Sequence, residues 1–161
     1  IKQHALPHQN KLNKKTERSR KHKKMKISFF LIPKMETAYM FEHETVSQAL
    51  EKMEYYRYNT LSVLDEQGRY KYALSATDFF HYMKHHPGTT YEKTEEITLS
   101  QVTPQTEIKA IDINDDVENL IKILLNQEYT PVIDGKQIYI GEVSVTEIME
   151  FVLKNRLIQN E

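Results

Sequence analysis

A serine followed three residues later by a carboxylate occurs twice, each time directly after a short apolar run. The first pair is Ser75 and Asp78, and the second is Ser144 and Glu147. If each serine begins a helix, the free N–H groups and the positive dipole end of that helix favour a phosphate. A carboxylate one turn into the helix can accept two hydrogen bonds from a ribose diol. Apolar residues on the neighbouring strands can cover a purine.

The same four residues have a purely structural interpretation. Ser-x-x-Asp and Ser-x-x-Glu are capping boxes, in which the serine caps the helix and the acid reaches back to the N–H group of the cap residue. A cap of this kind stabilises its helix by about 1 kcal/mol. Both interpretations stay open at the level of the sequence.

The two motifs belong to an internal repeat. Asp65 precedes Ser75 by the same distance as Asp134 precedes Ser144, because both members of the second pair lie 69 positions further on. Upstream, the apolar residues of 46–53 match those of 117–124 at an offset of 71. An internal repeat fixes the architecture. We expect two copies of one small unit, packed against each other.

Hydrophobic periodicity and turn signals give each copy the same elements. In the first copy we expect a strand at 38–41, a helix at 45–57, strands at 60–64 and 70–74, and a helix from 75 to 85. In the second we expect a short helix at 99–102, a strand at 108–111, a helix at 115–126, strands at 130–134 and 137–143, and a helix from 144 to 156. The fold class is therefore α/β (α+β), with two β-α-β-β-α repeats at 27–90 and 91–161 related by a pseudo-twofold axis.

The charge of −1 hides a strong asymmetry. Residues 1–26 hold ten of the 22 Lys and Arg residues and one of the 23 acids, which gives +9 there and −10 in the remainder. We expect residues 1–26 to be a disordered basic tail, because such a composition buries too little apolar surface. The segment Met25-Lys26-Ile27 also has the form of an ordinary start, so the tail can equally be an upstream extension.

Composition excludes several functions. The chain has no cysteine, which rules out disulfides and suits a cytoplasmic protein. It has no apolar run long enough to span a bilayer and no signal-peptide pattern, so we expect no membrane association. A Gly-rich phosphate loop and a nucleophile-elbow motif are both absent, and we do not expect an enzyme.

The strand-helix-strand-strand-helix pattern resembles the CBS domain, and the tandem resembles the CBS pair, or Bateman module. The resemblance rests on three features. They are a strand of the form hydrophobic-Pro-Val-hydrophobic-Asp, a Gly-x-x-Ser/Thr-x-x-Asp motif near the end of each unit, and a duplication whose spacing needs no gap. The opening Phe29-Phe30-Leu31-Ile32-Pro33-Lys34 is also similar to stand-alone CBS-pair proteins of Gram-positive bacteria. The resemblance implies a regulatory module that binds an adenosine nucleotide, AMP, ADP, ATP or cyclic di-AMP, between the repeats. It implies no cofactor and no metal.

The resemblance also implies site residues. The hydroxyl of each motif would meet a phosphate and the acid would hold the ribose, with Thr77 and Thr146 near the same helix starts. The adenine would lie between the first strand and the Pro-Val strand of a repeat. The implied set is Ala38, Tyr39, Leu61, Ser62, Ser75, Thr77 and Asp78 in the first repeat, and Ala110, Ile111, Thr130, Pro131, Ser144, Thr146 and Glu147 in the second.

The chain departs from the family pattern at three positions. Tyr72 stands where the family has Gly, so its ring could narrow or fill the first cleft. Ser62 replaces the usual Pro, and Glu147 carries its carboxylate one methylene further out than Asp. The second repeat keeps Gly141 and Pro131. One cleft could therefore be empty.

Other clusters have more ordinary explanations. His81 and His85 share a helix face and could bind a metal, but imidazoles near a helix C-terminus are favourable through the dipole alone. Tyr55, Tyr56 and Tyr58, together with Arg57, could stack on bases, but at a helix end packing or dimer contacts are the favoured interpretation.

Three functional hypotheses remain. The first is a nucleotide sensor that acts as a homodimer on a protein target. The alternative is a ligand-free CBS-pair dimerisation scaffold, in which both motifs are only caps. The third makes the basic tail a nucleic-acid tether, and a solvated tail is the favoured explanation.

Overall fold

The computed structural model describes residues 25–158, so nearly all of the predicted basic tail lies outside the described residues. The two β-α-β-β-α repeats are confirmed. The first consists of β2 (Tyr39–Phe41), α2 (Val46–Tyr56), β3 (Thr60–Leu64), β4 (Tyr70–Ser75) and α3 (Ala76–His85). The second consists of β5 (Ile111–Asp112), α4 (Val117–Leu124), β6 (Tyr129–Ile133), β7 (Tyr139–Ser144) and α5 (Val145–Ile158).

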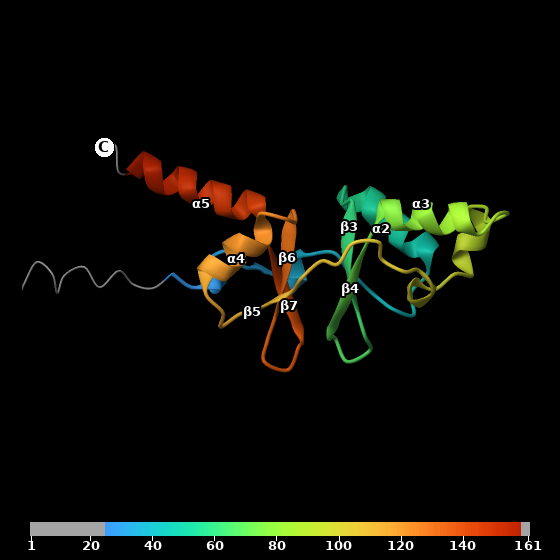
Figure 1. The fold of residues 1–161 in the computed structure, drawn as a ribbon, viewed down its shortest axis with the longest axis horizontal. Helices are drawn as coiled ribbons and strands as arrows, with labels where there is room; N and C mark the ends of the chain where they lie inside the picture. The colour runs from blue at the N-terminus through green and yellow to red at the C-terminus, as the bar shows by residue number, and fades with distance from the viewer. Residues whose placement is uncertain (1–24, 159–161) are drawn as a thin grey trace, which may run out of the picture.

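Each repeat forms its own sheet, and the strands of both lie in the middle of the molecule with the helices outside (Figure 1). In the first repeat β2 runs parallel to β3, and β3 runs antiparallel to β4. In the second repeat β5 runs parallel to β6, and β6 runs antiparallel to β7. The second sheet gains a fourth strand, β1 (Ile32–Pro33), so that its order is β1-β7-β6-β5. This strand comes from the N-terminal end of the described chain and pairs antiparallel with β7.

The predicted strand at 108–111 was too long, because the structure begins β5 only at Ile111. At 108–109, side chains form hydrogen bonds with the backbone groups that would otherwise pair with a neighbouring strand. Tyr70 donates its hydroxyl hydrogen to the carbonyl of Ile108, and the Gln127 amide bonds to both the N–H and the carbonyl of Lys109. The predicted short helix at 99–102 is a 3₁₀ turn, η4 (Leu99–Gln101). Three further 3₁₀ turns are η1 (Ile27–Phe29), η2 (Lys34–Glu36) and η3 (Glu92–Glu95).

The two hydrophobic cores exchange segments. Leu99 and Val102, which precede β5 in the second half of the sequence, are buried in the core of the first repeat. Ile27 and Phe30, which precede β2 in the first half of the sequence, are buried in the core of the second repeat, where the Phe30 ring meets Phe151 edge-on at 5.0 Å. Each core is therefore completed by residues from the other half of the sequence.

The two β-hairpins are also joined to each other. The Tyr70 N–H donates to the Gln137 carbonyl, and the Tyr139 N–H donates to the Gly68 carbonyl, so the contact is reciprocal. Gly68 and Gln137 are repeat equivalents, and both adopt a positive φ, 79° and 66°. The repeat symmetry thus extends to the backbone of the turns.

Candidate ligand cleft between the repeats

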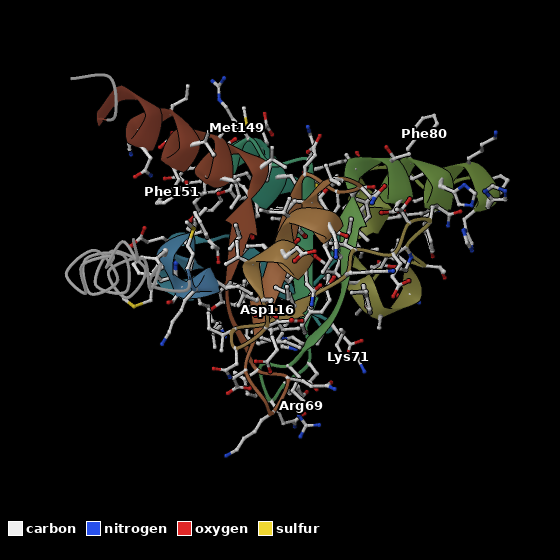
Figure 2. The ribbon with its side chains drawn as sticks, turned by 60° about the vertical axis from the view of Figure 1, so that its left-hand side comes forward. Arg69, Lys71, Phe80, Asp116, Met149 and Phe151 are labelled. Atoms are coloured by element: carbon white, nitrogen blue, oxygen red, sulfur yellow. The ribbon has the colours of Figure 1, made fainter. Side chains whose placement is uncertain are left out.

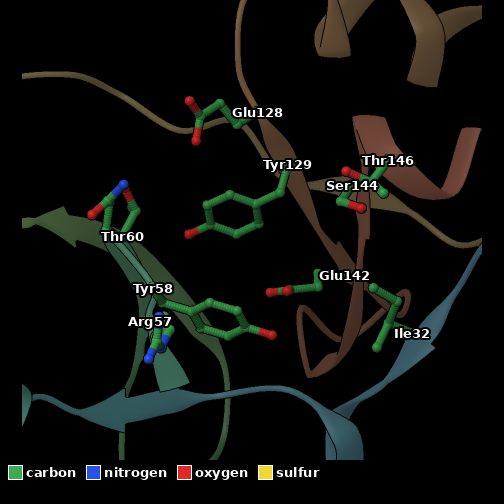
Figure 3. Close-up of a pocket in the computed structure, with 10 residues that line it drawn as sticks. Ile32, Arg57, Tyr58, Thr60, Glu128, Tyr129, Glu142, Ser144 and Thr146 are labelled. Atoms are coloured by element: carbon green, nitrogen blue, oxygen red, sulfur yellow. The ribbon is translucent and has the colours of Figure 1, made fainter. Parts of the chain in front are cut away.

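A cavity of about 300 Å³ lies between the repeats (Figure 3). Its walls come from both halves of the chain and from the β1 strand. It is lined by Ile32, Arg57, Tyr58, Asn59, Thr60, Glu128, Tyr129, Glu142, Ser144 and Thr146.

The first-repeat wall is the turn that follows α2. Arg57 ends this helix in the left-handed conformation with φ 58°, and the Tyr58 N–H bonds back to the carbonyl of Met53. The reversal directs the chain toward β3 and leaves the exposed Arg57 and the half-buried Tyr58 at the cavity. This wall supplies one permanent positive charge and one aromatic ring.

The second-repeat wall is the junction between β7 and α5. Ser144 precedes the helix, and its hydroxyl oxygen accepts a hydrogen bond from the Glu147 N–H at 3.2 Å. Thr146 lies in the first turn of the same helix and is exposed. The wall therefore combines two hydroxyl groups with the N-terminal end of a 14-residue helix, where an anion is favoured.

Glu142 brings a buried carboxyl group into the cavity. Its side chain is only 9% exposed, and the Tyr139 hydroxyl donates to its Oε2 atom at 3.2 Å. Burial raises the pKa of Glu142 to about 7, against the effect of the Tyr139 hydrogen bond, which lowers it. Burial therefore favours the neutral form of this carboxyl group more than in an exposed glutamate.

Tyr58 and Tyr129 extend into the cavity from opposite walls, and the Glu142 side chain lies between their rings (Figure 3). The Tyr129 hydroxyl lies 3.2 Å from the Ser62 Oγ atom, which links the two repeats directly. Burial raises the pKa of Tyr129 well above its usual range, and burial followed by the nearby Glu142 carboxylate raises that of Tyr58. Both phenols are uncharged at neutral pH, so they contribute ring faces and hydroxyl groups.

Of the residues predicted for the second repeat, only Ser144 and Thr146 line this cavity. Among the described residues, none donates a hydrogen bond to the Glu147 carboxylate, so this motif forms half of a capping box. The strand residues lie elsewhere. Ile111, Thr130 and Pro131 are buried in the sheet, and Ala110 borders a different cavity of about 440 Å³.

The first motif forms the complete capping box. The Asp78 Oδ2 atom accepts from the Ser75 N–H at 2.6 Å and from its hydroxyl at 2.7 Å, and Asp78 Oδ1 accepts from the Gln105 N–H at 2.8 Å. The side chain is 5% exposed. Both carboxylate oxygens are therefore engaged within the protein, in fixing α3 and in holding the segment that leads to the second repeat.

The other residues predicted for the first repeat do not meet in one cavity. Leu61 and Ser62 are each 1% exposed and Thr77 is exposed. Ala38 and Tyr39 line a separate hollow. Tyr72 packs against the first core, and its hydroxyl donates to the Leu99 carbonyl at 3.3 Å.

Arg57, Tyr58 and Glu142 were not assigned to a site from the sequence. Tyr58 was interpreted as a packing or dimer contact, and it does pack against the first core, but it also lines the cavity. The repeat offered a signal for Glu142, because its equivalent 69 positions earlier is Ala73. The two repeats differ at this strand position, where one has a charged residue and the other a small apolar residue. Such a difference indicates a function that only the second repeat needs.

The histidines of α3 lie side by side. The His81 and His85 rings lie 4.1 Å apart on one helix face, as predicted, and the His85 Nδ1 atom lies 2.9 Å from the His81 carbonyl oxygen. Within residues 25–158, no three His, Asp or Glu side chains are grouped so that they could hold a metal ion. None of the helices described there has the length and apolar character needed to cross a membrane.

Comparison with known proteins identifies one family and many solved structures of similar fold. A family model described as CBS domain matches residues 36–85 and 99–154, one range within each of the two predicted repeats. No curated protein matches the chain. CbpB in complex with c-di-AMP superposes with a TM-score of 0.75 at 14% identity, over 94% of this chain and 96% of that chain.

Two further solved structures are similar. CbpB from Listeria monocytogenes in complex with c-di-AMP has a TM-score of 0.70 at 18% identity, over 84% of this chain and 98% of that chain. CBSX2 in complex with AMP has a TM-score of 0.66 at 18% identity, over 81% of this chain and 98% of that chain. At such identities the likeness shows the fold.

Proposed function

Because this chain belongs to the CBS-domain family, we propose that it is a regulatory module that senses an adenosine nucleotide in the cavity between its repeats. The candidates are AMP, ADP, ATP and cyclic di-AMP. The observation that carries the proposal is the position of Ser144 and Thr146. These hydroxyl groups, at the N-terminal end of α5, line a cavity that the other repeat closes with Arg57 and Tyr58.

The chemistry of the cavity suits a nucleotide. The N–H groups at the start of α5, together with the Ser144 and Thr146 hydroxyls, would bind a phosphate, and Arg57 would add charge from the opposite wall. The Tyr58 and Tyr129 rings offer apolar faces to the base. A volume of about 300 Å³ is at the lower end of the range for small-molecule sites. It suits a mononucleotide or one half of a cyclic dinucleotide.

The similar structures support the same class of ligand, since two of them hold c-di-AMP and one holds AMP. A nucleotide that touches both walls would change the free energy of one arrangement of the repeats relative to another. A coupling of about 1–3 kcal/mol is enough to alter the binding of a protein target. The proposal requires neither a catalytic step nor a cofactor, and it places the protein in the cytoplasm.

The proposed regulator is a homodimer. Phe80 on α3 and Met149 on α5 are repeat equivalents that are 70% and 55% exposed, and both point away from the body (Figure 2). A second copy could cover both, and association of apolar surface is favourable. Analytical ultracentrifugation of the double variant Phe80→Glu, Met149→Glu should show a monomer. A monomeric wild-type protein would contradict this part of the proposal.

Thermal unfolding in the presence of each nucleotide tests the sensor. A ligand that binds the folded state at 100 times its Kd stabilises that state by about 2.7 kcal/mol, so the Tm should rise. Ser144→Ala removes a cap and a proposed phosphate contact, whereas the matched variant Ser75→Ala removes only a cap. The nucleotide-dependent rise in Tm should disappear in the first variant and persist in the second. The opposite pattern would overturn the assignment.

One observation favours the alternative, a ligand-free dimerisation scaffold. Asp78, which the family resemblance assigned to the ribose, has both oxygens occupied within the protein. If none of the four nucleotides raises the Tm of the wild-type protein, the scaffold is the better description.

A further inference from the structure

Glu142 is a buried acid that lines the cavity between the repeats. The acids of the two Ser-x-x-acid motifs, Asp78 and Glu147, do not line it. Asp78 is engaged in its capping box and in the contact with Gln105. Glu147 does not line the cavity, whereas Glu142 does. The inference drawn from this difference rests on the proposed function.

The sheet fixes the position of Glu142. Its backbone lies between two strands, with Ile32 of β1 on one side and Pro131 of β6 on the other. Successive side chains of a strand point to opposite faces. Val143 enters the second core, and Glu142 and Ser144 accordingly both face the cavity. The carboxyl group is therefore held by a three-stranded frame.

The orientation of the carboxyl group is also fixed. The Tyr139 hydroxyl donates to Oε2, and the same hydroxyl lies 3.1 Å from the Thr37 Oγ1 atom. No described residue donates a hydrogen bond to Oε1, and no buried side-chain oxygen of the described residues lacks a partner. Oε1 is consequently accessible from the cavity, and it can accept a hydrogen bond from a ligand.

The spacing indicates which part of a nucleotide would meet it. Residues i and i+2 of a strand are about 6.6 Å apart. With a phosphate at Ser144 and the start of α5, the group about this far along the same wall is the sugar. We propose that Glu142 holds the ribose of the bound nucleotide through Oε1, and so selects ribonucleotides over their deoxy analogues. In this proposal the sugar is bound by a carboxylate on the strand β7, and not by the motif carboxylate on the helix that follows it.

Calorimetric titration with matched ligand pairs tests this role. The pairs are AMP with 2′,3′-dideoxy-AMP, and c-di-AMP with its 2′-deoxy analogue. The wild-type protein should prefer the hydroxyl-bearing member by about tenfold or more, as expected for a hydrogen bond to a charged group. The preference should fall several-fold in Glu142→Gln and to about threefold or less in Glu142→Met, which keeps the length but accepts hydrogen bonds only weakly. Thermal unfolding checks that both variants fold.

Glu147→Gln separates the two acids. If the ribose is held by Glu142, this variant keeps the wild-type preference. A preference that is lost in Glu147→Gln and kept in Glu142→Met would overturn the proposal, as would equal wild-type affinity for both members of each pair. If the wild-type protein binds none of AMP, ADP, ATP and c-di-AMP, the proposed function fails and this inference fails with it.

Discussion

Gly141 lies so close to Ile32 that a Cβ atom on Gly141 would stand 2.1 Å from the Ile32 carbonyl oxygen. The φ angle of Gly141 is 152°, in a region that residues with a side chain rarely adopt. The contact occurs where β1 pairs with β7. At the equivalent position of the first repeat stands Tyr72, and β4 is the edge strand of its sheet. One residue thus distinguishes the four-stranded sheet from the three-stranded one.

Gly141→Ala should displace β1 and lower the free energy of unfolding by about 2 kcal/mol or more, because backbone strain of about 1–3 kcal/mol is added to a steric clash. Urea unfolding measures the change. Gly135→Ala is the matched control, since a Cβ atom there has nothing within 4 Å. Equal stabilities for the two variants would show that β1 does not depend on Gly141.

Gln137→Gly should raise the free energy of unfolding by about 1 kcal/mol, because Gln137 has φ 66° and glycine carries no steric penalty there. The reciprocal change, Gly68→Gln, should lower it by a similar amount. An added Cβ at Gly68 would make only an ordinary contact with the Lys34 Nζ atom at 3.7 Å, so the backbone angle dominates. Thermal unfolding of both variants provides the comparison, and a loss of stability in Gln137→Gly would refute the argument.

Stability should depend on the protonation of Glu142. Its pKa is about 7 in the folded protein and ordinarily 4.5. Because the folded state binds the proton more tightly, the stabilisation is complete below pH 4.5 and is lost as the pH rises through 7. The full loss is about 3 kcal/mol. The free energy of unfolding of the wild type, measured against that of Glu142→Gln, should therefore fall between pH 5 and pH 8. Parallel pH profiles for the two proteins would contradict the assignment.

Asp78→Asn should cost stability rather than nucleotide affinity. The carboxylate accepts three hydrogen bonds within the protein, and an amide group in its place cannot accept all of them. We expect the free energy of unfolding to fall by about 1–3 kcal/mol. Calorimetry of the folded variant should give an AMP affinity close to that of the wild type. A large loss of affinity without a loss of stability would restore Asp78 as a ligand-binding residue.

The sequence predicted the repeats well because the signals for them are local and occur twice. The equal spacing from Asp65 to Ser75 and from Asp134 to Ser144 located two hairpins and the starts of two helices. The strand β1 could not be predicted in this way, because two residues are too few to show a period. Its pairing depends on a glycine far along the chain.

The cleft was predicted only in part for a related reason. Ser144 and Thr146 carry a motif, and they were identified by it. Tyr58 and Glu142 carry none, and they become cavity residues only when the two repeats are packed together. A motif records what one segment does by itself, whereas a cleft between two segments depends on how they face each other.

The exchange of segments between the two cores has a consequence for the order of events on the ribosome. Thr37 and Tyr139, which meet in the folded protein, are 102 positions apart. At about 5–20 residues per second, roughly 5–20 seconds of translation separate them. During that interval Ile27 and Phe30 have emerged, but the core that buries them has not yet been synthesised. The nascent chain therefore keeps these apolar side chains outside their native core until its last strand is made.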